Sequence, residues 1–369
     1  MTSRFFRSYA PFLILVAALV LTAVPAAGQA TFGTLAAQGN LAFSHGKFAD
    51  AEKAYVEALK QPKETPEATS REAAILNSLA IIYSLEGRYA ESESLCLRAV
   101  ALVETTSANS DPVLASILSA LGSVNLHLGK YSKAEQYIQR AIALRKHDSR
   151  DDHAGLLADY TLLGVALCSQ DKCRQAEQVI QQALPLCEFG SIDCQNGSAA
   201  ARATLAAIYA RRGRYREAEE SYNEAVEILQ EAFGPSKSML VPLLADLASL
   251  YASRSRFSEA EATGRRALEI AAKDLSGSDA AARAALATGQ ALAGQGHFEA
   301  AEPYFKQSLA IHERAQGPES IQYAWALQPY ARFLRKAHRS AEASVIETRS
   351  NAMLNRAGQI VDVSEFRKH

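Results

Sequence analysis

Four cysteines lie close together in the chain, and sulfur chemistry is what their types and spacing allow. Cys168, Cys173, Cys187 and Cys194 are separated by four, thirteen and six residues. A structural zinc site normally uses tighter C-x2-C pairs or paired histidines, so we predict no metal site and no cofactor. In an exported chain, clustered cysteines instead favour disulfide bonds, because oxidising compartments preserve them.

Cys187 and Cys194 are the first candidate pair, because together they close a short loop. Cys168 and Cys173 are the second, and their pairing depends on a turn geometry that the sequence does not give. The same two residues carry an alternative, a thiol redox function, although C-x4-C departs from the usual C-x-x-C. Cys96 stands apart and is interpreted as a small buried apolar residue.

Other side chains of chemical interest are scattered. The chain has eight histidines, and it contains no H-E-x-x-H, G-x-S-x-G, G-x-G-x-x-G or P-loop pattern. Nothing in these motifs points to an enzyme, and we predict a non-enzymatic protein.

The elements that must position these residues repeat along the chain. An alanine or serine recurs with gaps of 41, 42, 42, 42, 42, 41 and 40 residues, which is a fixed period. These anchor positions are Ala51, Ser92, Ala134, Ala176, Ala218, Ala260, Ala301 and Ala341. In five copies a glycine stands five residues before the anchor, and in six an aromatic stands three before it. Small residues at helical spacing predict two helices that approach closely around a glycine turn.

This order of small, aromatic and glycine positions resembles the tetratricopeptide repeat, or TPR. The period resembles the long repeats of kinesin light chains. The fourth copy departs from the pattern at Asp171 and Cys173, and the eighth at Lys336 and His338. The resemblance implies an all-α fold, a TPR-like α-solenoid of about eight repeats, in which antiparallel helix pairs form a right-handed superhelix. One such pair cannot bury its apolar face alone, so neighbours must stack.

In the TPR family the first helix of each pair lines a concave groove where a peptide usually binds. Carried over to this chain, that role falls on small, mostly neutral residues. The candidate groove positions are Asn77, Ile81, Ser119, Ser123, His127, Thr161, Val165, Ala203, Ala207 and Arg211. Asn77 is not repeated, so the asparagine ladder of kinesin light chains is largely missing. A groove of this kind is suited to a helix or an extended peptide.

The N-terminus has the layout of a secretory signal peptide. Arg4 and Arg7 precede an uncharged run over 11–24, and small residues follow up to Ala30. We therefore expect a signal peptide at 1–30, a repeat array at 31–354 and a tail at 355–369. The protein would be periplasmic or extracellular, with a membrane-anchored form as the alternative if the segment is not cleaved.

Charge gives no reason to expect other partners. The net charge is −1, which is too near neutral to favour nucleic acid or an anionic membrane. The leading hypothesis is an exported scaffold that binds a protein or peptide in its groove. The alternatives are the thiol redox function and self-assembly through the end repeats.

Overall fold

The fold is helical throughout the part of the chain that the structure describes. The computed structural model describes residues 31–356 except 62–65, 107–111, 148–151 and 188–190. Within these residues there are sixteen α helices, one short 3-10 helix and no strand. The predicted all-α class is confirmed. The expected signal peptide and most of the expected tail lie outside the described residues.

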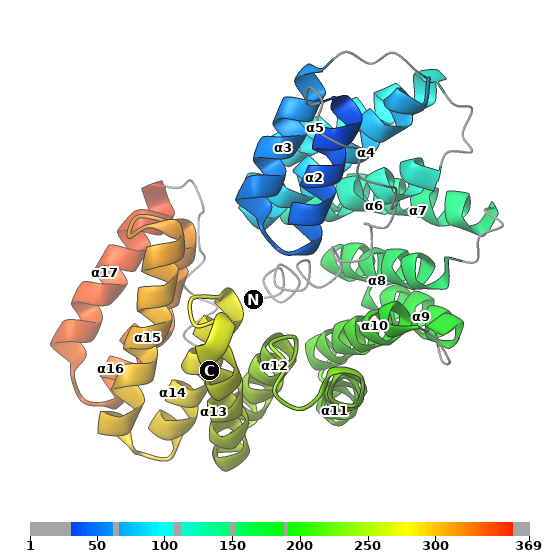
Figure 1. The fold of residues 1–369 in the computed structure, drawn as a ribbon. Helices are drawn as coiled ribbons and strands as arrows, with labels where there is room; N and C mark the ends of the chain where they lie inside the picture. Colours follow the sequence, from blue (N-terminus) through cyan, green and yellow to red (C-terminus); the bar gives the residue numbers. More distant parts are fainter. Residues whose placement is uncertain (1–30, 62–65, 107–111, 148–151, 188–190, 357–369) are drawn as a thin grey trace. The chain divides into compact units, whose positions relative to one another are not determined.

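The α helices follow one another as eight helix pairs (Figure 1). The first four pairs are α2 (Phe32–Ser44) with α3 (Phe48–Lys60), α4 (Pro66–Leu85) with α5 (Tyr89–Thr106), α6 (Pro112–His127) with α7 (Tyr131–His147), and α8 (His153–Ser169) with α9 (Cys173–Ala183). The 3-10 helix η3 (Leu184–Cys187) follows α9. The other four are α10 (Ile192–Arg211) with α11 (Tyr215–Phe233), α12 (Leu240–Ser253) with α13 (Phe257–Asp274), α14 (Asp279–Gly294) with α15 (Phe298–Gln316), and α16 (Ile321–Lys336) with α17 (Ser340–Arg356).

The chain forms two compact units, and the boundary between them falls within the fifth pair. The first unit ends at Arg214 and the second begins at Tyr215, in the turn between α10 and α11. In the first unit, the first helices α4, α6, α8 and α10 each contact the next one. In the second unit, α12, α14 and α16 do the same. This stacking of neighbours is the packing that the solenoid prediction requires.

Apolar side chains continue the core from one pair to the next. Leu76 of α4, Val103 of α5 and Leu118 of α6 belong to one buried cluster. Within a pair, a small residue on the first helix lets the second helix approach. A Cβ atom added at Gly164 would lie 2.4 Å from Ile180 Cδ1, so glycine is needed there.

Each turn between paired helices contains one residue in the left-handed region. Glycine occupies it in five repeats, for example Gly87 with φ 78°. Asp171, Ser255 and His338 occupy it in the other three, with φ of 64°, 59° and 60°. The next residue donates its N–H back into the first helix, as Arg88 does to the Tyr83 carbonyl oxygen at 2.8 Å. These hydrogen bonds provide donors for carbonyl groups in the last turn of the first helix, which have no N–H partner within the helix.

The eighth repeat is in a different register from the one predicted. The left-handed residue is His338, α17 begins at Ser340, and the buried alanine is Ala343. Ala341, which the sequence comparison had aligned with the anchors, is exposed. The sequence lacks both the glycine and the aromatic in this copy, so nothing in it marked the turn. With Ala343 as the anchor, the last gap is the 42 residues from Ala301 to Ala343.

A ladder of ion pairs joins consecutive repeats. In each rung, the glutamate after an anchor residue binds the basic residue four positions before the next anchor. The six rungs are Glu52–Arg88, Glu93–Lys130, Glu135–Lys172, Glu177–Arg214, Glu219–Arg256 and Glu302–Arg339. In three of them the arginine also lies over a tyrosine ring at the end of the first helix, as Arg88 lies 3.6 Å from the centre of Tyr83.

None of the described helices combines the length and the apolar composition that crossing a membrane requires.

Candidate functional site

The candidate groove positions all fall on first helices of the first unit. We call the side of α4, α6, α8 and α10 that carries them the first-helix face. Ser119, His127 and Arg211 are partly accessible there. The other positions are buried: Asn77, Ile81, Ser123, Thr161, Val165, Ala203 and Ala207. A ligand on this face would therefore first contact the three accessible side chains.

Ser119 belongs to a charged network that joins three helices. Its hydroxyl donates to Asp159 Oδ1 on α8 at 2.5 Å. Arg145 of α7 donates from Nε to Asp159 Oδ2 at 2.9 Å and also forms an ion pair with Asp152. Asp152 in turn accepts the N–H of Gly155 at 2.9 Å as the N-cap of α8. The accessible serine is therefore fixed by contacts to the next repeat.

Asp159 is almost fully enclosed, with 1% of its surface exposed. Burial raises the pKa of its carboxyl group to about 6, although Arg145 and the hydrogen bond from Ser119 both favour the ionised form. An ionisable group of this kind so close to the first-helix face makes the packing of α6 against α8 dependent on pH.

The sequence analysis missed this network, and a similar pair in the second unit. There, Arg283 of α14 binds the buried Asp246 of α12, and Asp279 at 3.0 Å. A signal was present, because Asp159 and Asp246 each interrupt an apolar run with the same Leu-Leu-Ala-Asp sequence. A carboxylate in the middle of a buried helix needs a partner, so a basic residue on a neighbouring helix was to be expected.

His127 lies at the end of α6 and stacks on an aromatic residue of the preceding repeat. Its ring centre is 4.5 Å from that of Tyr89, with 7° between the ring planes. Tyr89 is the first residue of α5, where most repeats have an aromatic. The imidazole is thus held flat against the neighbouring turn, which fixes its orientation on the first-helix face.

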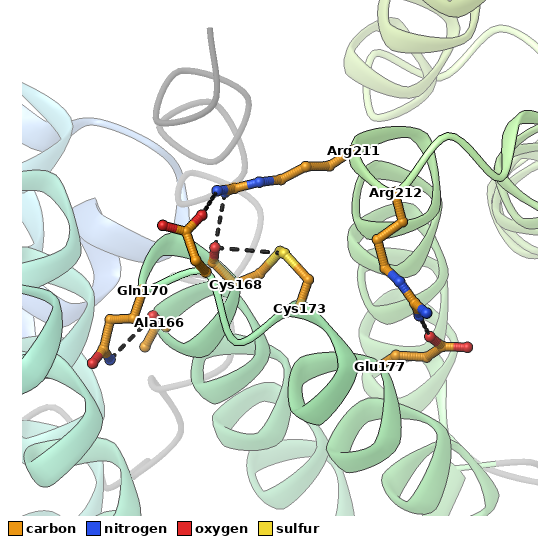
Figure 2. The surroundings of a disulfide bond; sticks show 8 residues. Ala166, Cys168, Gln170, Cys173, Glu177, Arg211 and Arg212 are labelled. Atoms are coloured by element: carbon orange, nitrogen blue, oxygen red, sulfur yellow. Dashed lines mark hydrogen bonds and ion pairs between the residues drawn. A yellow bond between two sulfur atoms is a disulfide. The ribbon is translucent and has the colours of Figure 1, made fainter.

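Arg211 occupies the corresponding position two repeats later, but the turn that it meets is different. It is the last residue of α10, and its guanidinium donates to the Cys168 carbonyl oxygen at 2.8 Å. It also forms an ion pair with Asp171. Figure 2 shows the guanidinium reaching the turn of the fourth repeat, while Arg212 points to Glu177. Arg211 is therefore positioned by the cysteine-containing turn.

The four clustered cysteines lie in two pairs at disulfide distance, Cys168–Cys173 and Cys187–Cys194. These are the two combinations considered from the sequence. The Cα atoms are 4.0 Å apart in the first pair, which spans the turn between α8 and α9. They are 5.0 Å apart in the second, which joins η3 to the first turn of α10.

Cys96 is buried and unpaired, and burial raises the pKa of its thiol to about 12, so it is not a reactive thiolate. In the part of the chain that the structure describes, no group of three or more His, Cys, Asp or Glu side chains is arranged to hold a metal ion.

Comparison with solved structures shows the same fold in proteins of very different sequence. The apo form of the quorum sensor NprR from B. thuringiensis aligns with a TM-score of 0.66 at 10% identity, over 88% of this chain and 87% of that one. A Rap protein in complex with competence and sporulation factor aligns with a TM-score of 0.67 at 14% identity, over 91% of this chain and 90% of that one.

The Rap conjugation gene regulator of plasmid pLS20, in complex with the Phr* peptide, aligns with a TM-score of 0.60 at 11% identity, over 90% of this chain and 97% of that one. No curated protein matches the chain. The sequence model of the MalT-like TPR region matches residues 71–362, which is well over half of the chain. Together with the eight helix pairs in the described residues, this match shows that the protein belongs to the tetratricopeptide-repeat family, with a MalT-like TPR region.

Proposed function

We propose that the protein is an exported, non-enzymatic scaffold that binds a peptide or a helix of a partner protein on the first-helix face of the first unit. The observation that carries this proposal is the set of accessible polar side chains on that face. Ser119 and His127 lie on α6 and Arg211 lies on α10, and each is oriented by a contact to a neighbouring repeat. Polar groups that are already ordered bind a ligand at a lower cost in entropy.

The kind of partner is supported by two of the similar structures. One is a complex with competence and sporulation factor and another is a complex with the Phr* peptide. Those ligands belong to those proteins. The shared fold supports a peptide as the class of ligand.

Export is supported by two separate features of the chain. The first 30 residues have the order of a signal peptide, basic, apolar and then small. The two cysteine pairs at disulfide distance fit an oxidising compartment, where such bonds persist.

Site-specific photo-cross-linking in the native cell envelope tests the proposal. A photoreactive phenylalanine derivative replaces His127 on the first-helix face, and in a matched control it replaces the exposed Gln139 on α7 of the same repeat. We expect a cross-linked partner from position 127 and none from position 139. Peptides from the cross-linked segment should then bind the purified protein in fluorescence anisotropy. Capture from position 139 alone, or from neither position, overturns the proposal.

A further inference from the structure

The turn of the fourth repeat differs chemically from the other turns. Residues 168–173 connect α8 to α9, and the two ends of this segment carry the paired sulfur atoms. Where most repeats have glycine and an aromatic, this turn has Asp171 in the left-handed region and Cys173 at the first position of α9.

This turn holds the guanidinium of Arg211. The exposed fraction of the Arg211 side chain is 14%, whereas that of Asp171 is 87%. Two acceptors of the guanidinium, the Cys168 carbonyl oxygen and the Asp171 carboxylate, lie inside the segment that the disulfide closes. The position of Arg211 on the first-helix face therefore depends on the conformation of this closed segment.

The two sulfurs are not equivalent. Cys173 is 9% exposed and Cys168 is completely buried. Cys173 is also at the N-terminus of α9, where unpaired backbone N–H groups and the helix dipole stabilise a thiolate. Both cysteines are buried, and Cys173, at the helix N-terminus, is the one that keeps some exposed surface, so an attacking thiolate would reach its sulfur first.

We propose that the Cys168–Cys173 pair is a thiol–disulfide exchange site for a dithiol reductant, and that its oxidation state controls how firmly Arg211 is held on the first-helix face. One thiolate of the dithiol attacks Cys173 Sγ, the bond to Cys168 Sγ breaks, and Cys168 leaves as a thiolate that takes up a proton. The second thiol of the reductant then attacks the mixed disulfide. Cys173 is released as a thiol, and the reductant becomes a disulfide.

Reduction removes the link across the turn while the chain remains intact. The turn that carries Asp171 is then closed only by its backbone hydrogen bonds, such as that from the Lys172 N–H to the Leu167 carbonyl oxygen at 3.0 Å. Two of the acceptors of Arg211 are then less firmly fixed, so its guanidinium is held less firmly and reacts more readily with solvent or with a carboxylate of a ligand. Reduction would therefore also change the affinity for an acidic peptide. Only this change in affinity rests on the proposed function.

The reactivity of Arg211 toward phenylglyoxal, which modifies free guanidinium groups, tests the inference without a peptide. The full chain is labelled before and after treatment with dithiothreitol, and the modified arginines are quantified by mass spectrometry. We expect the rate at Arg211 to rise several-fold on reduction. Arg212 is the internal control, because it binds Glu177 outside the closed segment, and its rate should not change.

Two double variants assign the effect to one disulfide. C187S/C194S should still respond to dithiothreitol at Arg211. C168S/C173S should label quickly in both conditions, with circular dichroism used to show that it is folded.

Asp171→Gly, which keeps the disulfide and removes the carboxylate, gives a second measurement, and Arg211 should label faster in it before reduction. Equal rates at Arg211 in the oxidised and reduced parent overturn the inference, whereas failure of the cross-linking experiment alone would overturn only the proposed function.

Discussion

Glu177 and Arg214 are separated by 37 residues in the chain, and their side chains meet at 2.7 Å. Glu177 stands directly after the anchor Ala176, and Arg214 stands four residues before the next anchor. The contact therefore recurs with the repeat, and it explains why a glutamate so often follows the anchor. Six copies of one weak interaction recur in the same register, at every junction between neighbouring repeats except that of the sixth with the seventh.

Removing one rung should destabilise the array slightly but measurably. Glu177→Gln removes the carboxylate that Arg212 and Arg214 share, and we expect a loss of about 1 kcal/mol in the free energy of unfolding in urea. Glu220→Gln is the matched control, because Glu220 pairs only with the exposed Arg216 within the same helix. If Glu220→Gln lowers the free energy of unfolding as much as Glu177→Gln does, the ion pair between repeats contributes no more than an ion pair within one helix.

The buried carboxyl group of Asp159 should make stability depend on pH. Its pKa is raised from the ordinary 3.8 to about 6, so between these values the folded state binds the proton more tightly than the unfolded state. Stability is therefore greatest with Asp159 protonated and falls as pH rises through this window, by an amount on the order of 3 kcal/mol. Asp159→Asn should remove this fall in urea unfolding between pH 4 and pH 7.

Ser119→Ala provides a second test of the same carboxyl group. It keeps the charge of Asp159 and removes a hydrogen bond that favours the ionised form, so the pH at which stability falls should move upward. A pH profile of Asp159→Asn parallel to that of the parent would contradict the assignment.

Gly164 should not tolerate a side chain. A Cβ atom there would meet Ile180 Cδ1 at 2.4 Å and Cγ1 at 2.8 Å, so Gly164→Ala should cost about 1–3 kcal/mol of stability. Adding Ile180→Ala should make the double variant less destabilised than the sum of the two single changes. Gly277→Ala, with open space around it, should change stability little. If the loss of stability in the double variant equals the sum of the two single losses, the side chains at positions 164 and 180 are not in steric conflict.

The register of the eighth repeat can be tested with glycine. His338 has φ 60°, so His338→Gly should raise the free energy of unfolding by about 0.5–1 kcal/mol. Lys336→Gly places glycine where the sequence comparison had put the turn, inside the last turn of α16, and should lower stability by roughly the same amount. If His338→Gly lowers stability and Lys336→Gly raises it, the turn lies where the sequence pattern had placed it.

The repeat architecture was predictable because it depends on side-chain size at fixed spacing. Small residues, aromatics and glycines recur often enough to place seven of the eight turns. The eighth was placed two residues too early, because Ala341-Glu342 matches the alanine-glutamate pattern of the anchors, whereas the buried Ala343 is followed by a serine. Both cysteine pairings were among the combinations that the spacing allowed, but only the turn geometry brings Cys168 and Cys173 together.

The candidate site was less predictable than the fold. Thr161 and Ala203 were named from the family pattern, and they are buried, because neighbouring first helices pack against them. What orders the accessible residues is contact between repeats, such as Tyr89 beneath His127 and Asp171 beside Arg211. Such contacts join residues about 40 positions apart, and a comparison of each repeat with its own consensus does not reveal them.

The ion-pair ladder also bears on how a further repeat could be added to the array. Each rung takes its carboxylate from one repeat and its cation from the next, so the ladder has a polarity. After Ala343, where all seven earlier repeats have glutamate, the chain has Ser344, whose hydroxyl donates to the Ser340 carbonyl oxygen at 3.0 Å. A ninth repeat grafted onto α17 would find no acceptor for its turn cation. Lengthening the array by protein engineering would therefore have to begin with Ser344→Glu.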